Sequence, residues 1–244
     1  MTIAGDQIHH HLEAVAHERH LRHATPGLEA QVVRLKAYQQ ARFARTHADL
    51  LGHPRYQPTA RFFLDELYGP RDFSSRDAQF ARIVPGLVKL FPQEFVTTVA
   101  TLTDLHALSE RLDTGLARHL PAAPAIDRGA YVLAWQASGD PAGRKRQIDL
   151  VLNVGQALDR YTRNPLLRGT LRVMRGPARA AGLASLQAFL EAGFDAFAGM
   201  HGATEFLRSI EARERALAER LFAPDAPAAA GQSPVTDALL GQLP

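Results

Sequence analysis

The residues with the clearest chemical potential gather between positions 61 and 77. Two adjacent carboxylates, Asp65 and Glu66, are followed by a mixed segment that ends at Arg76 and Asp77. Arginine matches a carboxylate with two parallel hydrogen bonds, so we favour a rigid helix–loop–helix corner. The alternative is a polar site that binds an anion or performs acid–base chemistry. Its predicted ligand or partner surface comprises Phe62, Asp65, Glu66, Tyr68, Arg71, Asp72, Arg76 and Asp77.

Histidines form the second group that could do chemistry. His17 and His20 are three positions apart and can share a helix face. A metal site needs three or four converging ligands, whereas adjacent helical residues point about 100° apart. We therefore favour a solvated, pH-sensitive face and predict no metal site. The N-terminal histidines are His9, His10, His11, His17, His20 and His23.

His106 is the histidine best placed for a cofactor, because it lies within a strongly helical pattern. A single histidine on a helix is more often a hydrogen-bonded core or boundary residue, but it can also be an axial haem ligand. The alternative to a binding protein is thus a haem- or metal-binding sensor or enzyme. It would use His106 or the N-terminal histidines. The cofactor, and whether the protein is an enzyme, are left unknown.

Composition excludes several classes of protein. The chain has no cysteine, which rules out disulfides, thiolate metal sites and a cysteine nucleophile. It also lacks a nucleophile elbow, a phosphate-binding loop and a dinucleotide fingerprint. Between Arg168 and Arg179 arginines recur at helical spacing, which favours a solvated face over an anion-binding surface. A net charge of +3, with no aromatics among these arginines, argues against nucleic acid.

The elements that must position these residues are helices. Apolar residues recur at helical spacing nearly everywhere, and no sustained alternation indicates a strand. We predict an all-α domain of about eight to ten helices, one of them over 27–52. Asp127 and Asn164 are predicted N-caps, 139–141 ends one helix and opens the next, and 74–77 has the pattern of a capping box that ends at Asp77. Pro85 should cause a kink or break near Val84. The predicted divisions are a histidine-rich helix over 1–24, a helical domain over 25–222 and a disordered tail over 223–244. Without a secretory leader or an apolar run of membrane-spanning length, we expect a cytoplasmic protein.

Residues 62–73, which read FFLDELYGPRDF, resemble the hallmark of the FFLEELY-motif proteins, a family of uncharacterised bacterial proteins. The similarity continues through 87–112 and takes in 182–197. Asp65 stands where the family name has Glu, which keeps the charge. The resemblance implies one family domain over 28–222 and supplies no activity. We therefore predict a non-enzymatic binder of a partner protein, of a second copy, or of a hydrophobic or anionic small ligand.

Overall fold

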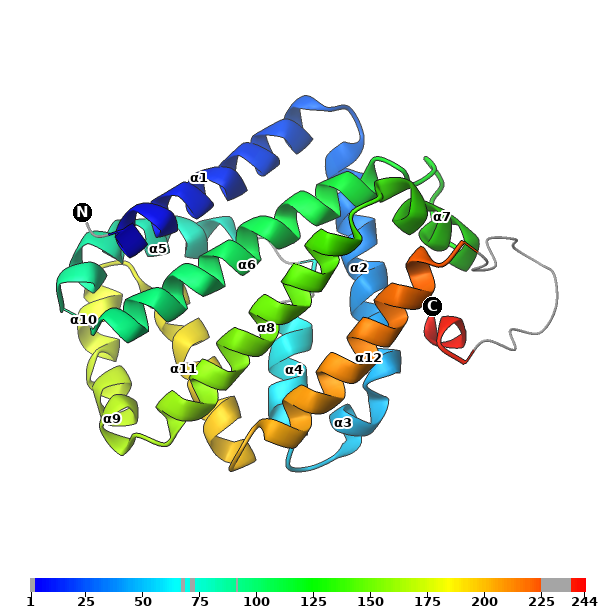
Figure 1. Cartoon of the computed structure of the whole chain (residues 1–244). Coiled ribbons are helices and arrows are strands. Elements are labelled where there is room, and N and C mark those ends of the chain that lie inside the picture. Colours follow the sequence, from blue (N-terminus) through cyan, green and yellow to red (C-terminus); the bar gives the residue numbers. More distant parts are fainter. Residues whose placement is uncertain (1–2, 67–68, 71–72, 91, 225–237) are drawn as a thin grey trace.

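The computed structural model describes residues 3–66, 69–70, 73–90, 92–224 and 238–244 (Figure 1). Over these ranges it consists of helices and contains no strand, which confirms the predicted all-α class. The helices are α1 Ile3–Ala24, α2 Leu28–Thr46, α3 Ala48–Gly52, α4 Gln57–Glu66, α5 Ser74–Leu90, α6 Gln93–Ala117, α7 Arg128–Ser138, α8 Pro141–Thr162, α9 Pro165–Val173, α10 Arg175–Ala180, α11 Ala184–Met200 and α12 Thr204–Phe222. A 3-10 turn, Leu240–Gln242, follows.

The long helix α6 organises the molecule. Helices α1, α6, α8 and α12 lie next to one another in that order and form one layer (Figure 1). Helices α2, α4, α5 and α11 lie behind this layer, and α9 and α10 form a corner beside α11. Helix-on-helix packing of this kind buries the apolar stripe of each helix without a sheet.

Predicted caps define several helix ends. The side chains of Asp127 and Asp140 accept hydrogen bonds from the backbone N–H groups of Ala130 and Gly143, at 2.8 and 2.7 Å. Asn164 caps α9 in the same way. Such side chains satisfy first-turn N–H groups that have no helical partner. Short polar residues before the apolar stripes therefore fix where α7, α8 and α9 begin.

The Asp127 cap provides a simple test of this account. Because alanine cannot accept the hydrogen bond from Ala130, Asp127→Ala should lower the free energy of unfolding by about 1 kcal/mol. Denaturant unfolding measures the change, and Asp127→Asn should recover most of it. An Asp127→Ala variant as stable as the wild type would contradict the role given to this cap.

Tertiary contacts altered three predicted elements. The helix predicted over 27–52 divides at His47, which is fully buried and bonded to Glu214 of α12. The corner after α9 contains a separate short helix, α10. No break occurs at Pro85, because α5 continues through this exposed residue. Of the predicted kink or break, only the kink remains a prediction.

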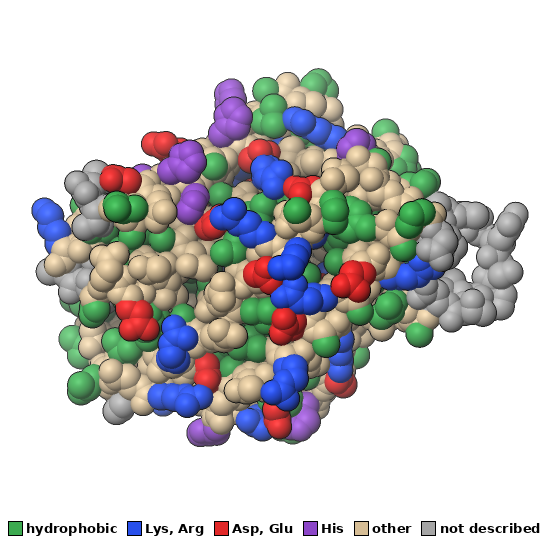
Figure 2. Space-filling model, viewed as in Figure 1, with side chains coloured by type: hydrophobic (Ala, Val, Ile, Leu, Met, Phe, Trp, Pro, Cys, Tyr) green, Lys and Arg blue, Asp and Glu red, His purple; other side chains and the backbone are tan. Residues whose placement is uncertain are grey.

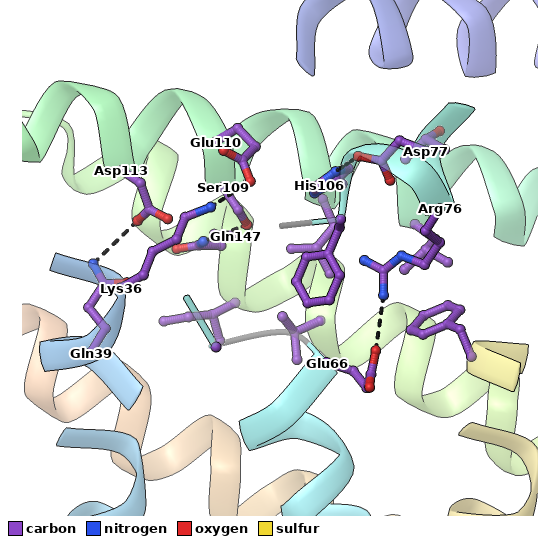
Figure 3. A pocket seen from close by; sticks show the side chains of 18 of the residues that line it. Lys36, Gln39, Glu66, Arg76, Asp77, His106, Ser109, Glu110, Asp113 and Gln147 are labelled. Carbon is purple, nitrogen blue, oxygen red and sulfur yellow. Dashed lines mark hydrogen bonds and ion pairs between the residues drawn. The ribbon is translucent and has the colours of Figure 1, made fainter. Parts of the chain in front are cut away.

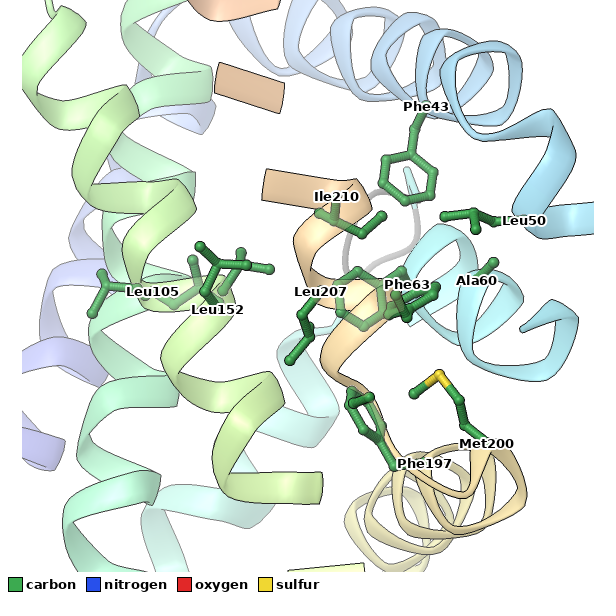
Figure 4. Close-up of a cluster of buried hydrophobic side chains, with 14 of the residues drawn as sticks. Phe43, Leu50, Ala60, Phe63, Leu105, Leu152, Phe197, Met200, Leu207 and Ile210 are labelled. Atoms are coloured by element: carbon green, nitrogen blue, oxygen red, sulfur yellow. The ribbon is translucent and has the colours of Figure 1, made fainter. Parts of the chain in front are cut away.

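Three groups of buried hydrophobic side chains make up the core of the described residues. The group drawn in Figure 4 joins α2, α4, α6, α8, α11 and α12, with Phe63 and Phe206 in edge-to-face contact at 5.5 Å between ring centroids. A second group lies around Tyr131 and a third around Ile8 and Phe80. Of the four phenylalanines of α11 and α12 predicted as core, Phe194, Phe197 and Phe206 are buried, whereas Phe189 is only partly buried.

Both chain ends pack onto this core. Helix α1 lies along α6 and buries Arg22, so it is held by charge as well as by apolar contacts. The end of the predicted disordered tail is packed, since Leu240 and Leu243 are fully buried against the group around Tyr131. Residues 225–237 of that tail lie outside the described ranges. Among the described helices, none is long and apolar enough to cross a membrane.

Candidate functional site

An internal cavity of about 150 Å³ lies between the two layers, along α6. A volume of this size holds a small organic molecule, since an apolar cavity of roughly 150 Å³ accepts benzene. Its lining is mixed: apolar side chains from α1, α5, α6, α8 and α11 alternate with charged and amide groups from α2, α5, α6 and α8. Figure 3 shows the polar groups gathered toward opposite ends of the pocket.

One face of α6 builds the long wall of the cavity. Its lining residues recur every three or four positions, so they fall on a single stripe. The N-terminal part of the stripe is apolar, like an ordinary core face. From Thr103 onward its residues are polar, although they still face the interior of the protein. Its members are Val99, Leu102, Thr103, His106, Ser109, Glu110 and Asp113. A core-facing stripe with this many polar residues indicates a site, because buried polar groups need partners.

Arg76 marks the first polar end. Its guanidinium lies 3.9 Å from the ring centre of Phe73 and 4.3 Å from that of Phe189. Glu66, at the end of α4, accepts its one ion-pair hydrogen bond among the described residues, at 3.2 Å. Burial lowers the pKa of Arg76, while Asp77 and Glu66 oppose that shift. The two rings hold the cation in place, and the residues that the structure describes leave most of its five N–H donors for a further partner.

His106 and Asp77 lie beside Arg76 at this end (Figure 3). His106 Nε2 is 2.9 Å from Asp77 Oδ2, and Arg19 of α1 donates to the same oxygen at 2.6 Å. Burial alone would raise the pKa of Asp77, but the bonds from His106 and Arg19 outweigh it and lower that pKa. The carboxylate orients the imidazole, whose Nδ1 is the ring nitrogen left for another partner.

Glu110 anchors the second polar end. Arg22 donates to its Oε2 at 2.5 Å and to its backbone carbonyl at 2.6 Å, and Lys36 Nζ lies 2.7 Å from Oε1. Burial would raise the pKa of Glu110, but Lys36 and Arg22 lower it to about 2. The negative charge of Glu110 is thus matched within the protein by cations from α1 and α2.

Asp113 is less well matched than Glu110. It is 6% exposed, and Gln39 Nε2 donates to its Oδ1 at 3.3 Å, a long hydrogen bond. Burial is the dominant influence and raises its pKa. The nearby hydroxyl of Tyr131 and Nε1 of Trp135 are buried and have no hydrogen-bond partner of normal geometry among the described residues. This end of the cavity therefore contains several polar groups that the protein itself leaves under-satisfied.

Helix α8 supplies the polar groups between the two ends. Gln147 Nε2 donates to Ser109 Oγ at 2.8 Å, and Arg144 donates to Gln147 Oε1 at 3.0 Å. The Arg144 guanidinium lies over the ring of Trp135, 4.6 Å from its centre. These contacts fix side chains from α6, α7 and α8 in one arrangement, so the wall is pre-organised before any ligand enters.

The predicted motif surface is only partly at this cavity. Glu66, Arg76 and Asp77 line it, whereas Phe62 and Asp65 do not. The Phe62 ring instead packs on Phe189 at 5.5 Å and covers a glycine of α11, where a side chain would collide with it. The three remaining predicted residues lie outside the described ranges: Tyr68, Arg71 and Asp72. The predicted capping role of Asp77 is replaced by its bonds to Arg19 and His106.

Most residues of the second polar end of the cavity, around Glu110 and Asp113, were not predicted from the sequence. The polar stripe of α6 and the i, i+3 pair Lys36 and Gln39 of α2 were the available signals. Neither helix reveals which of its faces meets the other, so the stripe is visible only with the packing known. The cavity residues that sequence reasoning missed are Lys36, Gln39, Ser109, Glu110, Asp113, Tyr131, Trp135, Arg144 and Gln147.

The other candidates lie elsewhere. Histidine side chains are visible along the outer edge of α1 in Figure 2, and His11 Nδ1 lies 3.3 Å from Thr103 Oγ1. Among the described residues, no group of three or more histidine, aspartate and glutamate side chains is arranged to hold a metal. In the arginine run, Arg168 pairs with Asp195 and Arg175 with Glu191, which ties α9 and α10 to α11.

Fold and site together define the class: a single-domain, all-helical protein with a cavity of mixed apolar and polar lining between its helix layers. The chain belongs to the family described as a domain of unknown function (DUF8198), whose model matches residues 18–228. That match contains both ends of the cavity except Leu12 of α1. Comparisons with curated proteins and with solved structures found no match.

Proposed function

We propose that the cavity binds a small amphipathic anion, with its acid group at Arg76 and its apolar body along α6. The observation that carries the proposal is the Arg76 guanidinium, clamped between two phenylalanine rings at the edge of an internal cavity. An arginine held this way is well suited to a carboxylate, because its planar fork can donate two parallel hydrogen bonds.

The apolar side chains of the lining support an apolar body for the ligand. They include Phe80, Val99, Leu102, Leu105 and Leu190, together with other aliphatic side chains. Small-molecule sites typically combine such apolar walls with a few placed polar groups that orient the ligand. At about 150 Å³, the cavity is suited to a medium-chain or aromatic acid rather than to a larger cofactor.

The proposal concerns binding and assigns no catalysis. We also propose that the protein is one of the bacterial FFLEELY-motif proteins that its sequence resembles. Three residues of that motif line the cavity, namely Glu66, Gly69 and Phe73. It also places the protein in the cytoplasm, as its sequence predicts. The haem or metal alternative, through His106 or the N-terminal histidines, remains a prediction. A group held by His106 would have to use the ring nitrogen that is not bonded to Asp77.

The fluorescence of Trp135 tests the proposal directly, since it is the only tryptophan of the chain and it lines the cavity. Titration with octanoate should change its emission and raise the melting temperature. Arg76→Gln should weaken octanoate binding about tenfold to 100-fold, the value of a charge-assisted hydrogen-bond pair. Octanamide, which lacks the charge, should bind both proteins with similar affinity.

Arg168→Gln is the matched control, because Arg168 is half-exposed and pairs with Asp195 away from the cavity. It removes the same charge and should leave octanoate affinity unchanged. The proposal fails if octanoate changes neither Trp135 emission nor melting temperature, or if Arg76→Gln and Arg168→Gln affect binding equally.

A further inference from the structure

We propose that the Asp113 end of the cavity is a second subsite, which accepts a hydroxyl group at the far end of the same ligand. This inference rests on the proposed function and narrows the ligand to an ω-hydroxy carboxylic acid or a molecule with the same two groups. It is drawn from the burial, the hydrogen bonding and the spacing of Asp113 relative to the Arg76 end.

Asp113 is the acid of the second polar end whose bonding the protein leaves incomplete. Glu110 receives hydrogen bonds from both Arg22 and Lys36. Within the part of the chain that the structure describes, Asp113 receives a single long bond, from Gln39. A carboxyl group offers about four acceptor positions when ionised, and a donor as well when protonated. A buried group with this capacity and one weak partner calls for a further partner at the cavity wall.

The surrounding charges favour a neutral group there. Lys36 and Arg144 both act on Asp113 electrostatically, so a ligand ammonium would bring a third positive charge to the same place. A hydroxyl adds no charge and can donate and accept at once. A hydroxyl can therefore bond Asp113 whether this carboxyl is ionised or protonated. Burial raises the pKa of Asp113, which favours its neutral, protonated form.

The spacing of the two ends sets the length of the ligand. Asp113 lies two turns beyond His106 on the same face of α6, which places them about 10 Å apart along the helix axis at 1.5 Å per residue. An extended alkyl chain advances roughly 1.3 Å per bond, given carbon–carbon bonds of about 1.5 Å. A chain of about eight carbons thus spans the distance along the axis of α6 from His106, beside Arg76, to Asp113.

The test compares octanoate, 8-hydroxyoctanoate and 8-methoxyoctanoate by the emission of Trp135. In the wild type the hydroxyl should strengthen binding about fivefold to tenfold, as expected for one buried hydrogen bond. The methoxy group can accept but cannot donate, so its gain should be smaller than that of the hydroxyl. Asp113→Leu should abolish the gain, taken as the ratio of the 8-hydroxyoctanoate and octanoate affinities of the same variant. Asp113→Asn, which keeps an acceptor of the same shape, should retain most of the gain.

These ligands separate the two proposals. If octanoate binds through Arg76 but the hydroxyl adds nothing, the second subsite is wrong and the proposed function stands. The subsite is also wrong if Asp113→Leu and the wild type show the same gain. If none of the three acids binds, both proposals fall. Far-ultraviolet circular dichroism and melting curves establish that each variant is folded, and the isosteric Asp113→Asn variant keeps the comparison available if Asp113→Leu is unstable.

Discussion

Replacing Glu110 with alanine is expected to lower the free energy of unfolding by about 3–5 kcal/mol. The reason is the position of Arg22, whose side chain is 3% exposed and whose ion-pair partner is Glu110. Removing the carboxylate leaves a buried guanidinium without its counter-charge, and water cannot easily replace it. Lys36 suffers less, because its side chain is 16% exposed and can extend toward solvent. Denaturant unfolding followed by Trp135 fluorescence measures the loss.

Two controls show whether the buried charge is the cause. Glu211→Ala removes a 42%-exposed carboxylate that pairs with Arg215, and should cost less than about 1 kcal/mol. The double replacement Arg22→Met with Glu110→Leu removes both buried charges and should recover most of the stability. If Glu110→Ala is no more harmful than Glu211→Ala, the ion pairs of Glu110 do not hold α1 and α2 against α6.

Acid is expected to unfold the protein between about pH 4.5 and pH 2. Glu110 and Glu214 each have a pKa of about 2 in the folded protein, against an ordinary value of 4.5. For Glu214, burial would raise the pKa, but Arg42 at 2.5 Å and His47 at 2.8 Å outweigh it. A lowered pKa means that the unfolded chain binds the proton first, so stability is complete above pH 4.5 and falls as pH decreases.

The size of the acid effect follows from these shifts. Protonation of each carboxylate lowers the free energy of unfolding by about 3 kcal/mol over this interval. The two losses together approach the whole free energy of unfolding of a typical domain. His47 makes stability fall at a higher pH than the two carboxylates do. Burial lowers its pKa in the folded protein, so below pH 6.5 the unfolded chain is protonated first. Asp113 has the opposite effect on stability. Its pKa is raised in the folded protein, so its protonation in acid favours the folded state and offsets part of the loss.

Unfolding free energies at pH 7, 5, 4 and 3 measure this dependence. The double variant Glu110→Gln with Glu214→Gln should be less stable at pH 7 and should have a flatter pH profile below 4.5. The isosteric amides retain hydrogen-bonding capacity but no longer titrate. A double variant whose stability falls with acid as steeply as that of the wild type would show that other groups govern the transition.

The helices and several of their ends could be predicted from the sequence, because the determinants are local. Apolar spacing in 93–117 and 184–200 indicated helices, and Asp127, Asp140 and Asn164 marked where three of them begin. Capping and amphipathic spacing act within one turn, so a single segment contains the information. The motif segment was also visible, and three of its predicted members line the cavity.

The division at His47 and the uninterrupted helix through Pro85 were not predictable in the same way. His47 ends α2 where its ring packs on Phe43 and bonds Glu214, which is 167 positions away. Helix α5 continues through Pro85, which is exposed. Local propensity is a weak prior that tertiary contacts override, and the end of α2 depends on what α12 places beside His47.

The sequence by itself determined the helical class, the apolar stripes and the presence of a charged motif ending at Arg76 and Asp77. Only the tertiary structure decided which charges meet. It set Phe189 of α11 against Arg76 of α5, paired Glu110 with Arg22 and Lys36, and left Asp113 facing a cavity with one weak bond. The physical reason is that the free energy of a buried charge depends on partners brought together from distant helices, which no local pattern encodes.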